Sequence, residues 1–208
     1  EEALNRSIVA PISLTNEGRN TILLSPDAPI WVTDDSTTLS EAVVLGLREK
    51  GFQTDRIALD NIQQLSSPEC LRGLVILAPP ANAMSENFLK DAFQLVQIAG
   101  PGFRHGDNQG KTMLVTVSRL DGMFGFDVLN AQNNPLSGGL AGLVKTAAHE
   151  WPEVHCKAID LAADFADTDT VANCLLEELF FDGPIEVGIS AQGVKTLELR
   201  QELLTVDS

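Results

Sequence analysis

A run of five apolar residues, Leu74–Ala78, ended by Pro79 and Pro80, is the feature that most constrains how this chain can fold. A strand with apolar residues on both faces is typical of a parallel sheet that helices cover on each side. The prolines end the strand because they have no N–H to donate to a neighbouring strand. The run therefore predicts the interior of an α/β fold.

Other periodic segments alternate between strands and helices. Ile30–Leu59 contains a strand, a helix that stops at Gly51 and a second strand, within the roughly 30 residues of a βαβ unit. The predicted strands are Arg6–Leu14, Ile30–Thr33, Thr54–Leu59, Leu74–Ala78, Met113–Val117 and His155–Leu161, with a closing hairpin of Ile185–Ser190 and Val194–Leu199. The predicted helices are Leu39–Lys50, Ser85–Ile98, a helix from Gly138 that Trp151-Pro152 ends, and Val171–Phe181.

This order predicts a Rossmann-like parallel sheet with helices on both faces, an N-terminal edge strand and a C-terminal hairpin. The length of 208 residues suits one domain. We expect a strand and connector over residues 1–29, the sheet domain over residues 30–200, and a tail or linker over residues 201–208.

The charge and cysteine content limit the partners and the compartment. The formal net charge is −15, from 29 acidic and 14 basic residues, which disfavours nucleic acid or an anionic membrane surface as a partner. Cys70, Cys156 and Cys174 are odd in number and widely spaced, which favours buried reduced thiols in a cytoplasmic protein. We expect neither secretion nor a membrane span, because no signal pattern or long apolar run is present.

The loop after the first central strand, Thr33–Ser40, is where a dinucleotide would bind in such a fold. A pyrophosphate needs glycines there, so that backbone N–H groups and the helix N-terminus can approach it closely. The loop contains no glycine, and Asp34 and Asp35 place two carboxylates where the pyrophosphate would lie. These residues favour a Rossmann-shaped scaffold without a cofactor over a nucleotide site.

The proton relay of short-chain reductases is incomplete in this chain. Those enzymes place a serine at a strand end and Tyr-x-x-x-Lys on the next helix, where the lysine lowers the pKa of the tyrosine that donates the proton. Here Ser118 ends a strand and Lys145 lies on the following helix, but Ala141 stands four residues before Lys145 on the same helix face. The chain contains no tyrosine, and a lysine alone does not replace the missing acid. Lys145 is therefore expected to be a solvent-exposed helix residue.

Two further patterns resemble ligand sites and fail on order or spacing. His105–Thr112 resembles a P-loop, but a histidine stands at the first glycine position and a strand is predicted after Lys111 where a helix is needed. His149, His155 and Cys156 suggest zinc, yet no second pair of ligands accompanies them. Metal binding is therefore not expected.

Two aspartates complete the candidate residues. Asp160 and Asp164 are interpreted as loop and cap residues after the fifth strand. No residue is assigned as catalytic, cofactor-binding or metal-binding.

Three segments together resemble a known family. The first, Leu140–Leu161, has the form GLxKTxxxEWP followed by DL, and the others are Thr116–Gly125 (TVSRLDGMFG) and Glu186–Ser190 (EVGIS). They resemble the ketoreductase region of multidomain polyketide synthases, and most of all that of iterative polyunsaturated fatty acid synthases. The resemblance covers most of Ile30–Arg200 in order and is most specific between Val115 and Leu161.

In that family the ketoreductase has two halves. The resemblance implies that this chain is the N-terminal half, a truncated short-chain-reductase-like fold that binds no cofactor and braces the half that contains the NADPH loop and the catalytic tyrosine. No position here matches those motifs, so no catalytic or NADPH-binding residue is carried over. The resemblance implies NADPH and a phosphopantetheine acyl carrier for the parent enzyme, with the catalytic half and neighbouring synthase domains as partners.

Two other functions stay open on the sequence. One is a free-standing short-chain reductase with an unusual acid. The other is a docking module for an acyl carrier or a neighbouring subunit, against which the net charge of −15 argues because carrier domains are usually acidic.

Overall fold

The computed structural model describes residues 5–104, 111–127, 129 and 133–203. The strands are β1 (Asn5–Ser13), β2 (Ile30–Thr33), β3 (Thr54–Ile57), β4 (Gly73–Leu77), β5 (Thr112–Ser118), β6 (Val154–Leu161), β7 (Glu186–Ser190) and β8 (Gly193–Leu203). The helices are α1 (Thr38–Glu49), α2 (Phe88–Arg104), α3 (Gly139–Glu150) and α4 (Thr168–Glu178), with short 3-10 turns η1 (Leu59–Gln64) and η2 (Pro135–Gly138).

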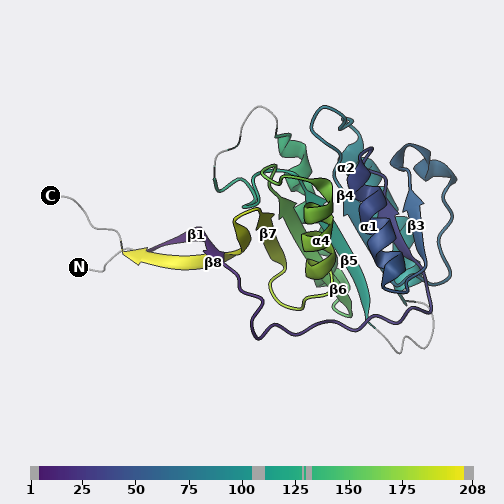
Figure 1. Ribbon diagram of the computed structural model, residues 1–208, viewed down its shortest axis with the longest axis horizontal. Helices are drawn as coiled ribbons and strands as arrows, with labels where there is room; N and C mark the ends of the chain where they lie inside the picture. The colour runs from purple at the N-terminus through teal and green to yellow at the C-terminus, as the bar shows by residue number, and fades with distance from the viewer. Residues whose placement is uncertain (1–4, 105–110, 128, 130–132, 204–208) are drawn as a thin grey trace.

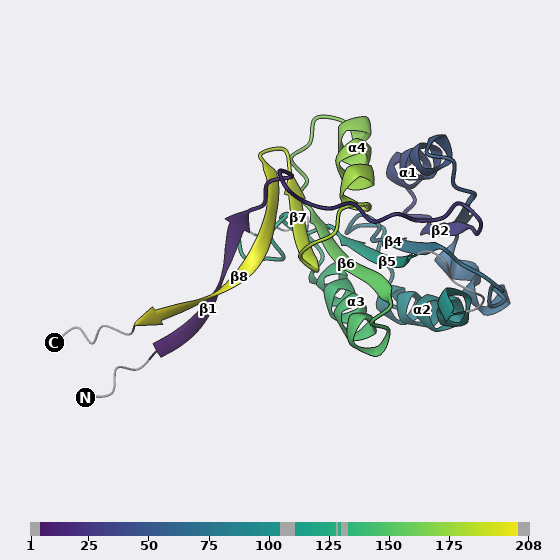
Figure 2. The same ribbon diagram turned by 90° about the horizontal axis from the view of Figure 1, so that it is seen from below.

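The strands form one sheet in the order β1-β8-β7-β6-β5-β4-β2-β3 (Figure 1). The pairings from β3 to β7 are parallel, and β8 and β1 are added as antiparallel strands. Helices α1 and α4 cover one face of the sheet, and α2 and α3 cover the other (Figure 2). The predicted Rossmann-like fold, with its edge strand and closing hairpin, is confirmed.

The direction in which strands are added reverses between β2 and β4. The chain passes from β2 outward to β3, returns to β4 on the other side of β2, and then adds β5, β6 and β7 in order. At such a switch point the loops at the carboxyl ends of the two strands diverge and leave a crevice, where α/β proteins bind their ligands. The topology therefore fixes where a site would lie.

Every residue of β4 and β5 is buried, as the apolar run predicted for the centre of the sheet. Two cores result, one on each face. The core beneath α1 and α4 includes Val43, Leu47 and Leu175, and the core beneath α2 and α3 includes Leu95 and Val144.

A buried ion cluster joins the N-terminal connector to the sheet. Glu178, at the end of α4, accepts two hydrogen bonds from Arg19, at 2.7 and 2.6 Å, and one from Lys157 of β6 at 2.6 Å. The Lys157 ammonium is fully buried and also donates to the Glu178 carbonyl oxygen at 3.0 Å. Because each charge has hydrogen-bonded partners, the cluster fixes the connector without an unpaired buried charge.

Helix α2 differs from its predicted bounds at both ends. It begins at Phe88, three residues later than predicted, and continues past Ile98 to Arg104 with Pro101 inside it. Pro101 cannot donate an intrahelical hydrogen bond. The next turn nevertheless buries Phe103 and brings Gly102 against Pro68, where a Cβ would lie 2.8 Å from the proline Cγ. Tertiary packing therefore outweighs the local preference of proline for ending a helix.

Strand β8 is longer than the sequence indicated. It was predicted to end at Leu199 and it ends at Leu203, because β1 pairs with it along nine residues. Pro11 lies in β1, at the edge of the sheet, as predicted.

None of the helices in the described part of the chain combines the length and apolar character that a bilayer crossing requires.

Candidate functional site

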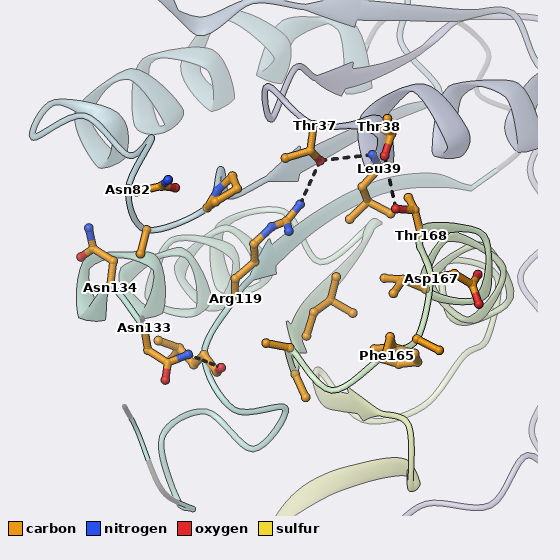
Figure 3. A pocket seen from close by; sticks show the side chains of 18 of the residues that line it. Thr37, Thr38, Leu39, Asn82, Arg119, Asn133, Asn134, Phe165, Asp167 and Thr168 are labelled. Carbon is orange, nitrogen blue, oxygen red and sulfur yellow. Dashed lines mark hydrogen bonds between the residues drawn. The ribbon is translucent and has the colours of Figure 1, made fainter. Parts of the chain in front are cut away.

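A cleft of about 1040 Å³ lies over the carboxyl ends of the central strands (Figure 3). Its walls are residues 37–39 after β2, residues 80–82 after β4, residues 119–120 and 133–135 after β5, and residues 161–163 and 165–168 at the end of β6 and after it. This is the crevice that the switch point creates. The wall combines apolar side chains such as Leu39 and Phe165 with neutral polar ones such as Asn82.

Asp35 fills the position at the start of α1 where such folds hold a phosphate. Its side chain is fully buried and accepts hydrogen bonds from the N–H of Thr37 at 3.1 Å and of Ser40 at 3.2 Å. The Thr37 hydroxyl donates to Asp35 at 2.5 Å and accepts from the N–H of Leu39 at 3.1 Å. The N–H groups that would otherwise bind an anion are therefore occupied by the chain itself.

Arg119 supplies the positive charge for this carboxylate. Its guanidinium forms an ion pair with Asp35, lies 3.4 Å from the Thr37 hydroxyl, and donates from Nε to the Ala78 carbonyl oxygen at 2.8 Å. Figure 3 shows Arg119 extending across the cleft wall toward Thr37. The pair joins the ends of β4 and β5 to the start of α1. A pyrophosphate at this terminus would have to displace Asp35 from all of these donors.

The rest of the first loop is also held by its own side chains. Asp34 accepts from the N–H of Ser36 at 2.9 Å and lies 3.5 Å from Arg56. Ser36 has a φ of 61°, a left-handed conformation that glycine adopts more readily. The loop thus makes its turn without glycine.

Ser118 and Lys145, the two residues of a reductase proton relay that this chain retains, do not come together in the cleft. Ser118 is buried and donates to Asp160 at 2.6 Å. Lys145 lies on α3 with 43% of its side chain exposed, in line with the expected exposed helix lysine, and it also forms an ion pair of 2.7 Å with Glu186 on β7. Ala141 packs in the core beneath α2 and α3. Neither Ser118 nor Lys145 lines the cleft, so the described residues assemble no proton relay there.

Solved structures identify the fold. An A-type ketoreductase from a modular polyketide synthase matches with a TM-score of 0.59 at 18% identity, over 97% of this chain and 44% of its own. An A1-type ketoreductase matches at 0.56 and 16% identity, over 93% and 42%. A GDP-L-fucose synthetase from Naegleria fowleri matches at 0.54 and 11% identity, over 88% and 78%.

The chain has a ketoreductase-like fold. The chain spans less than half the length of the two ketoreductases. No protein-family model matches the sequence, and no curated protein sequence matches it.

In this fold the loop after β5 is organised by Asp160. Asp160 belongs to the predicted strand His155–Leu161 and is also interpreted from the sequence as a loop or cap residue, and only the second assignment is wrong. Asp160 is a fully buried residue of β6, not a loop or cap residue. Its carboxylate accepts from the N–H of Leu120 at 2.9 Å, of Asp121 at 3.3 Å and of Phe124 at 3.0 Å. Burial raises the pKa of the Asp160 carboxyl, although the hydrogen bond from Ser118 and those from the backbone act in the opposite direction. A buried carboxyl needs such donors, and the loop supplies them.

Asp121 holds the other side of the same turn. It accepts from the N–H of Met123 at 2.8 Å, of Gly125 at 2.8 Å and of Asp127 at 2.9 Å. Burial acts to raise the pKa of Asp121, but these backbone donors outweigh it and keep the pKa below its usual value. The loop after Ser118 is long, and loops of this length are uncommon without a functional or packing role; the hydrogen bonds of Asp121 and Asp160 give this one a packing role.

Asp164 follows β6 as a loop residue, as predicted. It accepts from the N–H of Ala191 at 3.0 Å and from the Gln192 amide at 2.7 Å, and so holds the turn between β7 and β8.

The candidate metal ligands are dispersed. His149 is exposed near the end of α3, while His155 and Cys156, as neighbours on β6, point to opposite faces of the sheet. Burial lowers the pKa of His155 to about 4 and raises the pKa of the Cys156 thiol to about 12. Within the described ranges, no group of three or more His, Cys, Asp or Glu side chains could hold a metal ion.

The P-loop-like segment falls largely outside the described residues, which omit 105–110. Strand β5 begins at Thr112, so a strand follows Lys111 as predicted. Cys70, Cys156 and Cys174 are free thiols and each is partly buried.

Sequence reasoning missed Arg119, which completes the site. The available signal was the position of Arg119 directly after the predicted buried strand that ends at Ser118. Asp34 and Asp35, in the loop after the first central strand, are two carboxylates that such a cation could pair with. An arginine at the carboxyl end of a central strand lies within reach of that loop across the switch point.

Proposed function

We propose that this chain is the non-catalytic structural half of a ketoreductase, part of a multidomain synthase that makes polyketide or polyunsaturated acyl products. It would brace a second half that binds NADPH and reduces 3-ketoacyl groups on an acyl carrier. The observation that supports this most is the ion pair of Asp35 and Arg119, which occupies the helix terminus where a reductase of this fold would bind its dinucleotide.

The catalytic positions support the same proposal. Ala141 stands where the acid would be, the chain contains no tyrosine, and Lys145 is paired with Glu186 away from the cleft. The ketoreductases that share this fold match over 93% and 97% of this chain, and most of the length of each lies outside the match. The sequence form GLxKTxxxEWP supports the narrower assignment to a polyunsaturated fatty acid synthase.

A titration with NADPH tests the proposal. Trp31 is buried in β2, close to the first loop, so its fluorescence would respond to a nucleotide bound there. We expect no saturable change up to millimolar NADPH. Saturation at micromolar NADPH, or turnover of a model 3-ketoester by this chain alone, would instead show an autonomous reductase.

A further inference from the structure

The outer part of β1 and β8 forms a two-stranded ribbon that projects from the sheet (Figures 1 and 2). Only residues 193–196 of β8 pair with β7, and from Leu197 onward β8 pairs with β1 alone. We call residues 5–11 and 197–203 the β1–β8 ribbon. An isolated pair of strands is marginally stable in water, so a ribbon of this length gains stability when a further surface packs against it.

The ribbon has one charged face and one uncharged face. Residues directly opposite each other in an antiparallel pair point to the same face. On one face Arg6 pairs with Glu202 at 2.8 Å and Arg200 with Glu198 at 2.9 Å, so its charges are neutralised within the ribbon. The opposite face consists of Ser7, Val9, Pro11, Leu197, Leu199 and Gln201.

The centre of the uncharged face is an exposed apolar pair. Val9 lies directly opposite Leu199, and the two are 41% and 66% exposed. Pro11 and Leu197 extend the apolar surface toward the sheet, and at the other end the Gln201 amide donates to the Ser7 hydroxyl at 3.1 Å. We call this surface the Val9–Leu199 face. An apolar centre with an uncharged polar rim is the usual composition of a protein interface.

The open edge of β1 is less suited to a partner than this face. Leu14 donates its N–H to the Val194 carbonyl oxygen at 2.9 Å, so the even-numbered residues of β1 direct their backbone groups toward β8. The backbone groups of Val9 and Pro11 therefore face outward, and Pro11 has no N–H to donate. A proline within an edge strand opposes the addition of another strand.

We propose that, under the function proposed above, the Val9–Leu199 face packs against an apolar surface of the NADPH-binding half of the reductase, which that function would join to the chain after β8. Asn5 lies opposite Leu203 at the free end of the ribbon, so a domain joined there begins beside this face. A second copy fits less well, because two chains of net charge −15 would repel each other on approach.

The test uses this chain and the separately produced NADPH-binding half of its parent polypeptide, with binding followed by calorimetry. We expect Leu199→Asp to weaken the complex by about tenfold or more, as for a buried interface residue. The matched control is Leu23→Asp, at a leucine that is 83% exposed in the connector and lies outside the ribbon. Leu199→Ala serves as a second variant, with circular dichroism and melting temperature confirming that each variant folds.

The outcomes separate the two proposals. If the wild-type halves do not bind, the proposed function fails. If they bind and Leu199→Asp weakens binding no more than Leu23→Asp does, the proposed function stands and the Val9–Leu199 face is not the contact. Tighter binding by Pro11→Val would show that a strand adds to the β1 edge, and a dimer of this chain that Leu199→Asp dissociates would show that a second copy occupies the face.

Discussion

Arg119 and Asp35 are separated by 84 positions in the sequence and form an ion pair at the switch point of the sheet. Asp35 is fully buried, and the Arg119 side chain is 27% exposed to the cleft. The pair satisfies the start of α1 and links it to the ends of β4 and β5. It is the structural element on which both the stability of the site and its lack of an open anion position depend.

Arg119→Met should destabilise the chain because it leaves the Asp35 carboxylate buried without its counter-charge. We expect the free energy of unfolding, measured by urea denaturation, to fall by about 1–3 kcal/mol. Arg56→Met is the matched control, since the Arg56–Asp34 contact of 3.5 Å is half-exposed, and its effect should stay below about 0.5 kcal/mol. If the two variants lowered the free energy of unfolding equally, the buried Arg119–Asp35 pair would contribute no more to stability than the half-exposed Arg56–Asp34 pair.

Asp35→Gly should open an anion site at the start of α1. It removes the carboxylate that accepts from the N–H groups of Thr37 and Ser40, and it frees Arg119. We expect phosphate at about ten times its dissociation constant to stabilise this variant by about 1.4 kcal/mol, and to leave the wild type unchanged at matched ionic strength. Melting curves in phosphate and in sodium chloride measure this, and Arg119→Met in the Asp35→Gly background should abolish the response.

Gly188→Ala should be strongly destabilising. A Cβ at Gly188 would lie 1.8 Å from the Gly122 carbonyl oxygen, a backbone atom that moves only if the whole turn after β5 shifts. We expect a loss of about 3 kcal/mol or more. Gly142→Ala is the control on the open surface of α3, where nothing lies within 4 Å, and it should stabilise the chain by about 0.5–1 kcal/mol. The measurement is the denaturant midpoint of each variant. If Gly188→Ala and Gly142→Ala shifted the midpoint in the same direction, this explanation of the turn would be wrong.

His155 should make the stability depend on pH. Burial, followed by the nearby charge of Lys157, lowers its pKa from 6.5 to about 4. Between these values the unfolded chain binds a proton at His155 and the folded chain does not, so the stabilising contribution is complete above pH 6.5 and is lost as the pH falls toward 4. We expect a loss of about 2–3 kcal/mol over this interval from His155.

The measurement for His155 is a series of urea midpoints between pH 4 and 6.5 on the wild type and on His155→Gln. The variant should show a flatter dependence, whereas His149→Gln, at an exposed site on α3, should follow the wild type. Parallel curves for the wild type and His155→Gln would assign the pH dependence to other groups.

Periodicity in the sequence predicted the sheet and its helices well, because central strands such as Leu74–Ala78 are apolar on both faces. Proline or glycine also marks the ends of many strands and helices, as Pro152 does after the helix that ends before Trp151. Helix α2 was predicted less accurately, because Phe103 and Gly102 pack closely enough to offset Pro101. Such packing depends on residues distant in the sequence, such as Pro68, and leaves no local signal.

The site was predicted only by what it lacks. The first loop without glycine and the absence of tyrosine are local or compositional facts, so the sequence was sufficient to show them. The partner of Asp35 and the role of Asp160 depend on which strand ends meet across the sheet. A polar residue such as Asp160 near the end of an apolar strand resembles a loop residue unless the donors around it are known.

The carboxylate at the start of α1 belongs to the chain and is therefore present at one equivalent in every folded molecule. A dinucleotide in the same position would stabilise the fold only in proportion to the logarithm of its concentration. The occupancy of this terminus by Asp35 is independent of any metabolite pool. The start of α1 is therefore completed by the chain itself as soon as it folds, at any concentration of a dinucleotide.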